Sequence, residues 1–226
     1  EQLETAVFDG HFPVRWMPDA NYGYGYPFYN FYAPLSIYIT FLFRLFGFSF
    51  VRAIHLSHLL GYIVAAWGTF ALARRWFRND WAGLLAAAAY TVAPFHLVNV
   101  YVRGDSLAEF WAMAFYPLVI LAADGLIGGG RRQVALFALA YAALILSHNI
   151  SAMIFSPFLL LYLLLRFLPQ RTQRAQSILN FQSPISNLWF PISGLLLAFA
   201  LAAWFFVPAL VEQSLAQLGT VTSGYF

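Results

Sequence analysis

The residues best suited to chemistry lie in a short polar segment between two long apolar runs. Asp105 and Glu109 stand four positions apart in the string VRGDSLAEF. This spacing at a helix start turns both carboxylates to the same face. Such a pair can hold a divalent cation or act as a general base, and the neighbouring Arg103 can bind a phosphate. The structural alternative is a helix capping box, because Ser106 and Glu109 have the Ser-x-x-Glu spacing.

A second polar site interrupts the apolar run 133–165. His148, between Ser147 and Asn149, can act as a base or donate to a phosphate. Ionisable residues at membrane depth are costly and are therefore candidates for function, and we include Asn149 with His148 as a candidate binding residue. The alternative is that Asn149 or Ser151 caps the next helix and that His148 is a turn residue.

The N-terminal segment is the third candidate site. It runs from Asp9-Gly10-His11 through Asp19 to a repeated Tyr-Gly motif that contains Tyr24 and Tyr26. Aromatic faces stack on sugar rings, and glycines allow the backbone to approach a ligand closely. The alternative is an aromatic belt at the level of the lipid headgroups.

A metal site is not predicted. His55 and His58 are three positions apart and can share a metal, but the sequence offers no third ligand near them, so packing is the better interpretation. The chain also contains no cysteine, which excludes disulfides, thiolate metal sites and a cysteine nucleophile. A divalent cation at the two carboxylates is conceivable, and the cofactor is otherwise unknown.

The composition predicts the class of protein that must position these residues. Of the 226 residues, 62% are hydrophobic and 9% are charged, whereas a soluble domain averages about 25% charged. So few charges cannot form the polar surface of a soluble globule, which also excludes nucleic-acid binding. All twelve cationic side chains are arginine. We predict an all-α integral membrane protein with several spans.

Six apolar runs are long enough, or nearly so, to be transmembrane helices. We treat 133–167 as two short helices separated at His148, because this places the basic clusters before and after it on one side of the membrane, as the positive-inside rule favours. The predicted spans are 51–73, 82–101, 107–124, 133–147, 150–167 and 188–211.

The alternating direction of these spans sorts the charged residues. Most arginines fall on one side, which we assign to the cytoplasm, and Asp80 and Asp124 lie there as their expected partners. The other acids and the histidines fall at the outer side, where the candidate sites are. The arginines assigned to the cytoplasmic side are Arg74, Arg75, Arg78, Arg131, Arg132, Arg166, Arg171 and Arg174.

The stretch 34–48 differs from the spans. Its polar residues Ser36, Thr40 and Arg44 recur every four positions and share one helix face. Fifteen helical residues reach about 22 Å, less than the hydrocarbon thickness of about 30 Å. We therefore predict an amphipathic helix in the membrane plane, and divide the chain into an outer region, 1–50, and a membrane helical domain, 51–226.

Three strings together resemble a known family: FDGHFPVRWMPDANYGYGYPFYNFYAPLSIYI, VYVRGDSLAEFWAMAFYPLVILA and LSHNISAMIFSPFLLLYLL. They are similar to bacterial membrane proteins described as 6-pyruvoyl-tetrahydropterin synthase-related. The soluble enzyme of that name is a zinc protein, and its histidine triad is absent from this sequence. The architecture instead resembles the GT-C superfamily of membrane glycosyltransferases, which use lipid-phosphate-linked sugars.

The GT-C resemblance implies roles for individual residues. In that superfamily the first span leads to an outer loop with a catalytic acid, which Asp9 or Asp19 would supply here. Asp105 and Glu109 would be the acids of the second outer loop, and Arg103 and His148 would contact the phosphate. The chain then lacks one span upstream of Glu1 and is expected to be a piece of a longer protein of the bacterial inner membrane, with residues 1–50 outside.

Three hypotheses for function follow. The first is a GT-C-type glycosyltransferase acting on a lipid-phosphate-linked sugar at the outer face. It predicts that the outer carboxylates, Arg103 and His148 converge. The second is a non-catalytic accessory subunit that packs against other membrane subunits of a larger complex, for example a respiratory or photosynthetic one. It predicts outer acids that are splayed apart or paired only with local arginine. The third, a transporter, is weakest because no span has a charge near its middle.

Overall fold

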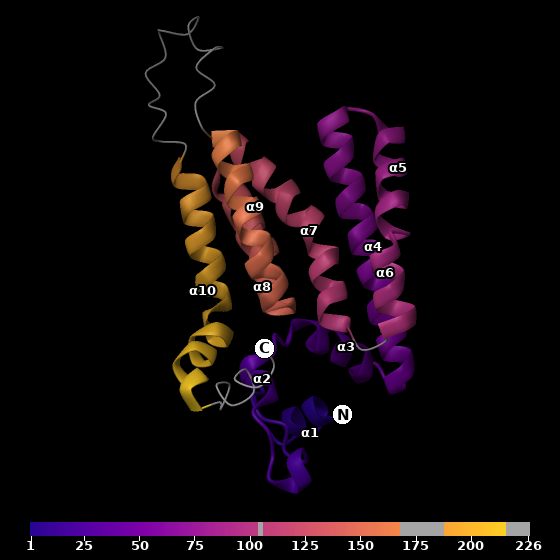
Figure 1. Ribbon diagram of the computed structural model, residues 1–226, viewed down its shortest axis with the longest axis vertical. Helices are drawn as coiled ribbons and strands as arrows, with labels where there is room; N and C mark the ends of the chain where they lie inside the picture. The colour runs from indigo at the N-terminus through magenta and orange to yellow at the C-terminus, as the bar shows by residue number, and fades with distance from the viewer. Residues whose placement is uncertain (104–105, 168–187, 216–226) are drawn as a thin grey trace, which may run out of the picture.

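The computed structural model describes residues 1–103, 106–167 and 188–215. Within these ranges every regular element is a helix, and the single strand-like pairing is a bridge between Met17 and Tyr26. The long helices stand side by side and alternate in direction (Figure 1). They are α4 (Phe50–Phe77), α5 (Asp80–Thr91), α7 (Leu107–Gly125), α8 (Arg131–Ser147), α9 (Asn149–Phe167) and α10 (Trp189–Glu212).

The predicted membrane class is confirmed in its coarse form. Among the described residues, four helices are long and apolar enough to span a membrane: Phe50–Phe77, Leu107–Gly128, Asn149–Phe167 and Trp189–Glu212. Asp80–Thr91 and Pro94–Arg103 pass the same test as a bent pair and make a fifth. The described part of the chain is therefore all-helical, with four or five helices able to span a membrane. The one predicted span not among these, 133–147, stays a prediction.

The helix of that fourth predicted span, α8, is short and lies between two neighbouring helices. It has 17 residues and begins with two arginines. Its Phe137, Ala138 and Leu144 are each 0% exposed, because α7 and α10 pack against it. A Cβ on Gly194 of α10 would lie only 2.6 Å from Cδ1 of Phe137. The glycine therefore lets the two helices approach closely.

The predicted division at His148 is confirmed. α8 ends at Ser147, His148 has extended backbone angles, and α9 begins at Asn149. Figure 1 shows α8 and α9 as neighbouring helices that run in opposite directions. The polar break therefore returns the chain across the bundle, as the distribution of arginine predicted.

Two prolines inside helices leave carbonyl groups that distant side chains satisfy. Pro117 has no N–H to donate to the carbonyl of Met113, and the hydroxyl of Tyr90 donates to that oxygen at 2.8 Å. Pro208 likewise frees the carbonyl of Trp204, which accepts from Nη2 of Arg15 at 3.1 Å. These contacts connect α5 to α7 and the N-terminal segment to α10.

A helix is present where one was predicted, α3 (Leu35–Leu45), and it crosses the end of the bundle (Figure 1). Its placement in the membrane plane stays a prediction. The helix is shorter than predicted because Gly47, at φ +85°, ends the segment. Its polar stripe is largely used inside the protein. Ser36 is 0% exposed, and Arg44 makes a two-pronged ion pair with Glu4, with distances of 3.0 and 3.1 Å.

The N-terminal segment folds against α3 around a small core of its own. It contains α1 (Gln2–Phe8), the short turn η1 (Asn21–Gly23) and α2 (Phe28–Phe31). The Tyr38 hydroxyl of α3 accepts from the backbone N–H of Val14 at 2.9 Å. The residues that form this core are Leu3, Ala6, Val14, Tyr29 and Phe41. The segment is ordered by α3 and α10, and the boundary at residue 50 stays a prediction.

The two ends of the bundle differ in charge. The helix termini that carry Arg74, Arg75, Arg131, Arg132 and Arg166 gather at the end opposite to the N-terminal segment (Figure 1). We refer to the two as the basic end and the loop end. Arg74 pairs with Asp80 at 2.6 Å, and Arg75 and Arg166 pair with Asp124, which confirms the expected partners. Arg171 and Arg174 lie outside the described residues, and the sidedness of the bundle in the membrane stays a prediction.

Candidate functional site

At the loop end, the first turn of α7 holds a carboxylate between two donors. Oε2 of Glu109 accepts from Nη1 of Arg103 and from the hydroxyl of Ser106, each at 2.7 Å. Arg103 ends η2 (Val98–Arg103), and its Nη1 also donates to the buried Asn99 at 3.3 Å. The Glu109 side chain is 21% exposed and that of Arg103 49%. Asp105, the second carboxylate of the predicted pair, lies outside the described residues.

The capping-box alternative is wrong for Ser106. In a capping box the serine oxygen accepts a backbone N–H at the helix start, but Ser106 makes no such side-chain cap and donates to Glu109 instead. The Ser-x-x-Glu spacing therefore orients the carboxylate of Glu109. Ser106 and Arg103 approach one of its oxygens, and Oε1 receives no hydrogen bond from the described residues.

His148 serves as the cap of α9. Its Nδ1 accepts the backbone N–H of Ser151 at 3.3 Å and lies 2.7 Å from the hydroxyl of the same residue. These contacts require an unprotonated Nδ1, so the ring carries its hydrogen on Nε2. The predicted alternative was a cap on the next helix from Asn149 or Ser151. A cap is present, but His148 provides it. Asn149, the first residue of α9, is exposed.

His148 lies within electrostatic reach of the Arg103–Glu109 pair. Burial lowers the pKa of His148, while Glu109 raises it and Arg103 lowers it. Three residues predicted to share a site, Arg103, Glu109 and His148, are therefore brought together by η2, α7 and the hairpin between α8 and α9. We call them the polar cluster.

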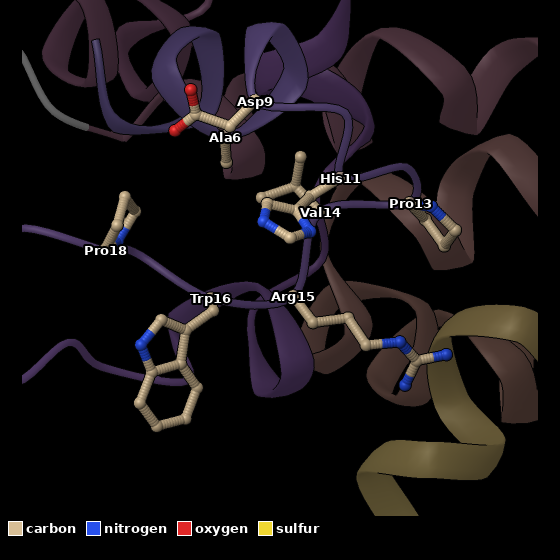
Figure 2. A pocket seen from close by; sticks show the side chains of 8 residues that line it. All are labelled: Ala6, Asp9, His11, Pro13, Val14, Arg15, Trp16 and Pro18. Carbon is tan, nitrogen blue, oxygen red and sulfur yellow. The ribbon is translucent and has the colours of Figure 1, made fainter.

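The N-terminal segment encloses a separate cavity of about 390 Å³, lined by Asp9, His11 and Trp16 among others. Figure 2 shows these three side chains around the cavity, whereas Arg15 extends away from it toward α10. Asp9 and His11 are exposed, and the Asp9 carboxylate makes no hydrogen bond or ion pair with the described residues. Trp16 is 50% exposed. We call this space the loop cavity.

The other predicted residues of the segment do not line this cavity. Asp19 pairs with Gln2, which donates from its side chain to the carboxylate at 3.1 Å and accepts the Asp19 N–H at 3.0 Å. Tyr24 is 83% exposed and Tyr26 53%. Asp19 is thus part of the local structure, and the two tyrosines project from the surface.

The local structure requires a glycine at position 25 of the Tyr-Gly motif. Gly25 has φ +80°, and a Cβ there would come within 1.8 Å of Nε1 of Trp16. Only glycine combines this backbone conformation with room for the indole. The motif therefore positions Trp16 at the loop cavity. Sequence reasoning placed His11 and Trp16 within the candidate segment but chose the tyrosines as its binding residues, although the spacing of the glycines was the available signal for Trp16.

A small cavity lies between the N-terminal segment and the start of α7. It measures about 190 Å³ and is lined by Glu4 of α1, Arg44 of α3, Ile54 of α4 and Leu107 of α7, among others. α1 ends at Phe8, directly before Asp9, and Leu107 lies two positions before Glu109. The elements that carry the loop cavity and the polar cluster are therefore in contact at one end of the bundle.

The two histidines considered for a metal are in different surroundings. His55 is exposed, whereas His58 is 7% exposed and its Nδ1 lies 3.0 Å from the carbonyl oxygen of Ile54. His58 also packs edge-on against Phe110. In the part of the chain that the structure describes, no group of three His, Asp or Glu side chains is arranged to hold a metal ion.

Comparison with known proteins gives one match. The sequence model of a family described as "6-pyruvoyl-tetrahydropterin synthase related domain; membrane protein" matches residues 29–222. No curated protein and no solved structure matches the chain significantly. The match covers most of the chain, from α2 through the helical bundle. The description of the family as a membrane protein agrees with the helices that are able to span a membrane.

Proposed function

Since the chain belongs to the family of membrane proteins with a 6-pyruvoyl-tetrahydropterin synthase related domain, we propose that it is a membrane enzyme of the GT-C glycosyltransferase type. Its substrate is a sugar carried on a lipid phosphate. Its active site lies at the loop end, which faces the outer side of a bacterial inner membrane. The loop cavity binds the sugar and the acceptor, and Arg103 and His148 of the polar cluster bind the phosphate of the lipid.

The observation that carries the proposal is the unpaired carboxylate of Asp9 in the loop cavity. A general base needs a carboxylate that is free to accept a proton. Asp9 meets this condition toward the described residues, whereas Asp19 is held by Gln2. Trp16 offers an aromatic face for a sugar ring, and the volume of about 390 Å³ falls in the range of small-molecule sites.

The reaction follows from these groups. The oxygen of an acceptor hydroxyl attacks the anomeric carbon of the sugar, and its proton passes to the carboxylate of Asp9. The bond between the anomeric carbon and the phosphate oxygen breaks, and the lipid phosphate leaves with the electron pair. Arg103 stabilises the negative charge of the phosphate, and the Nε2–H of His148 is a further donor to it.

The test measures transfer or release of sugar by the full protein in membranes. A polyprenyl-phosphate hexose with a tritiated sugar is supplied, and radioactivity is followed from the lipid phase into the aqueous phase. Asp9→Asn is expected to lower the rate by about a hundredfold or more, the usual contribution of a general base. Arg103→Gln lowers it by weakening the binding of the phosphate.

Asp19→Asn is the matched control, because it makes the same chemical change in the same segment at a carboxylate that Gln2 already occupies. It is expected to retain activity, provided that it unfolds at the same temperature as the wild type. Equal activity of Asp9→Asn and the wild type, or no release of sugar by the wild type, would contradict the proposal.

The second candidate function is an accessory subunit of a larger membrane complex. It is favoured by one observation, the pairing of Glu109 with the local Arg103 at 2.7 Å, which is the arrangement expected of a site without catalysis. Gentle solubilisation followed by affinity purification tests it. Stoichiometric co-purification of other membrane subunits together with full cell function of Asp9→Asn would replace the enzyme proposal by this one.

A further inference from the structure

At the basic end, one buried carboxylate joins three helices. Asp124, in the last turn of α7, is 3% exposed and forms ion pairs with Nε of Arg75 on α4 and Nη2 of Arg166 on α9. The hydroxyl of Tyr162 donates to the same carboxylate at 2.8 Å, and Nη2 of Arg75 donates to the backbone carbonyl of Asp124 at 3.1 Å. The proposed enzyme function uses none of these residues.

The charge of this group is not balanced. Two guanidinium groups face one carboxylate, which leaves a net charge of +1. Both arginines remain accessible, since the side chain of Arg75 is 46% exposed and that of Arg166 41%. A guanidinium has five N–H donors, and Nη1 of Arg75 donates to no acceptor among the described residues. The group can therefore accept a further anion.

A cavity lies against these donors. It measures about 560 Å³ and is lined by both arginines, Asp124, Tyr162, Trp76, Ile127 and Gly128. Trp76 is 48% exposed and lies 6.3 Å from Tyr162 between ring centroids. One wall of the cavity is thus cationic, and the other is aromatic and aliphatic.

We propose that this cavity binds the phosphate of an anionic phospholipid headgroup, with Arg75 and Arg166 as the phosphate ligands and Trp76 and Ile127 against the glycerol and the upper acyl chains. Arginine forks match phosphate oxygens in geometry as well as in charge. Asp124 does not repel the phosphate because its own charge is shared by the two arginines. Its function is to hold them at a fixed separation.

The surroundings favour a lipid over a soluble phosphate. The cavity lies at the end of helices that are able to span a membrane, and basic pockets between such helices are a recurring binding site for anionic headgroups. The exposed Phe77 (67%) and Trp81 (79%) flank the same end, where aromatic side chains contact the interface. A soluble anion would gain nothing from Trp76 and Ile127.

The test is a titration of the purified full protein in neutral detergent with phosphatidylglycerol, measured by the thermal unfolding temperature and by native mass spectrometry. Because a ligand that binds only the folded state stabilises it by an amount that grows with the logarithm of its concentration over Kd, phosphatidylglycerol is expected to raise the unfolding temperature and to remain bound as a defined adduct. Arg166→Gln is expected to weaken binding by about tenfold or more.

Two further variants keep the test interpretable. Arg78→Gln removes the same charge at the exposed end of α4, outside the cavity, and is expected to bind as the wild type does. Trp76→Ala leaves the ion pairs intact and is expected to weaken phosphatidylglycerol more than sn-glycerol 3-phosphate. It reports on the site even if Arg166→Gln fails to fold.

Three results would overturn the proposal. The first is an equal loss of affinity in Arg78→Gln and Arg166→Gln, which would indicate attraction to the whole basic end. The second is binding of inorganic phosphate or sn-glycerol 3-phosphate as tight as that of phosphatidylglycerol, which would indicate a soluble ligand. The third is equal binding of phosphatidylcholine, whose headgroup carries no net charge.

Discussion

Both ends of α7 carry an acid paired with arginine, and the two pairs are built differently. Glu109 in the first turn receives Arg103, six positions away in the sequence. Asp124 in the last turn, about 22 Å along the helix, receives Arg75 and Arg166 from two other helices. The first pair is local and partly accessible, whereas the second is tertiary and its carboxylate is buried.

The helix dipole explains part of this difference. A negative charge is stabilised at a helix N-terminus and destabilised at a C-terminus. Glu109 therefore needs little support, and a single local arginine is enough. Asp124 adds its charge to the negative end of α7, and two arginines are needed to make its burial acceptable. Arg75 also donates to the backbone carbonyl of Asp124, in the last turn of α7. The pair at the basic end therefore ties three helices together, while the pair at the loop end is held within one stretch of chain and stays partly accessible.

The sharpest test of this contrast is Asp124→Asn. It keeps the shape of the side chain but leaves two neighbouring arginines uncompensated, so we expect unfolding to become easier by about 2–3 kcal/mol. Thermal unfolding in detergent measures this. Asp80→Asn is the control at the same end, since the Arg74–Asp80 pair is 59% and 66% exposed and an exposed pair contributes about 0–1 kcal/mol. Equal effects would contradict the assignment of Asp124 as a tertiary contact.

The middle of α7 provides an intermediate effect. Tyr90→Phe leaves the carbonyl of Met113 without a donor, and we expect a loss of about 1–2 kcal/mol in the free energy of unfolding. Pro117→Ala restores an N–H within α7 for the same carbonyl. In a double-mutant cycle, Tyr90→Phe should therefore cost less in the Pro117→Ala background than in the wild type. An unchanged cost would show that the two residues are not coupled. Tyr101→Phe, at a side chain 78% exposed, serves as the control.

At the loop end, Glu109→Gln is expected to change the free energy of unfolding by less than about 1 kcal/mol. The glutamine oxygen can still accept from Ser106 and Arg103, and the arginine stays solvated. The measurement is the same thermal unfolding used for Asp124→Asn. A loss as large as that of Asp124→Asn would remove the distinction between the two ends of α7.

The smallest expected effect concerns pH. Burial holds the pKa of His148 below its ordinary value, so the unfolded chain binds the proton more readily than the folded protein does. Stability from this residue is therefore present at pH above about 6.5 and is lost as the pH falls toward the lowered pKa. His148→Asn keeps a cap for α9 without a titrating group.

The check compares the change in unfolding temperature between pH 7.5 and 5.5 in the two proteins. The wild type should lose more on acidification than His148→Asn. The difference between the proteins cancels the contribution of other groups that titrate in this range. A wild type that is no more sensitive to acid than the variant would contradict the environment described for His148.

Hydropathy and charge along the sequence predicted where helices end and which charged residues gather at one end of the bundle. The division at His148, the helix from Leu35 and the pairing of Asp80 and Asp124 with arginines followed from these patterns. The contacts that could not be predicted are those between a side chain and a distant backbone group. Pro208 indicates a freed carbonyl at Trp204, but nothing in the sequence indicates that Arg15 donates to it.

The candidate site was predicted in a similarly partial way. Arg103, Glu109 and His148 were selected as ionisable residues next to apolar runs, and they do lie near one another. The choice between Asp9 and Asp19 could not be made from the sequence, because it depends on Gln2 folding back onto Asp19. The position of Trp16 depends on the backbone conformation of Gly25. Residue types alone point instead to the tyrosines on either side of that glycine.

The hydrogen bond from Arg15 to Trp204 also bears on the order in which the contacts of the protein can form during synthesis. The two residues are separated by 189 positions, and a nascent chain emerges from its N-terminus first. The N-terminal segment is therefore synthesised long before α10 exists to receive Arg15. Its final attachment has to wait until α10 has been inserted, so the loop cavity is translated well before the contact that holds it against the bundle can form.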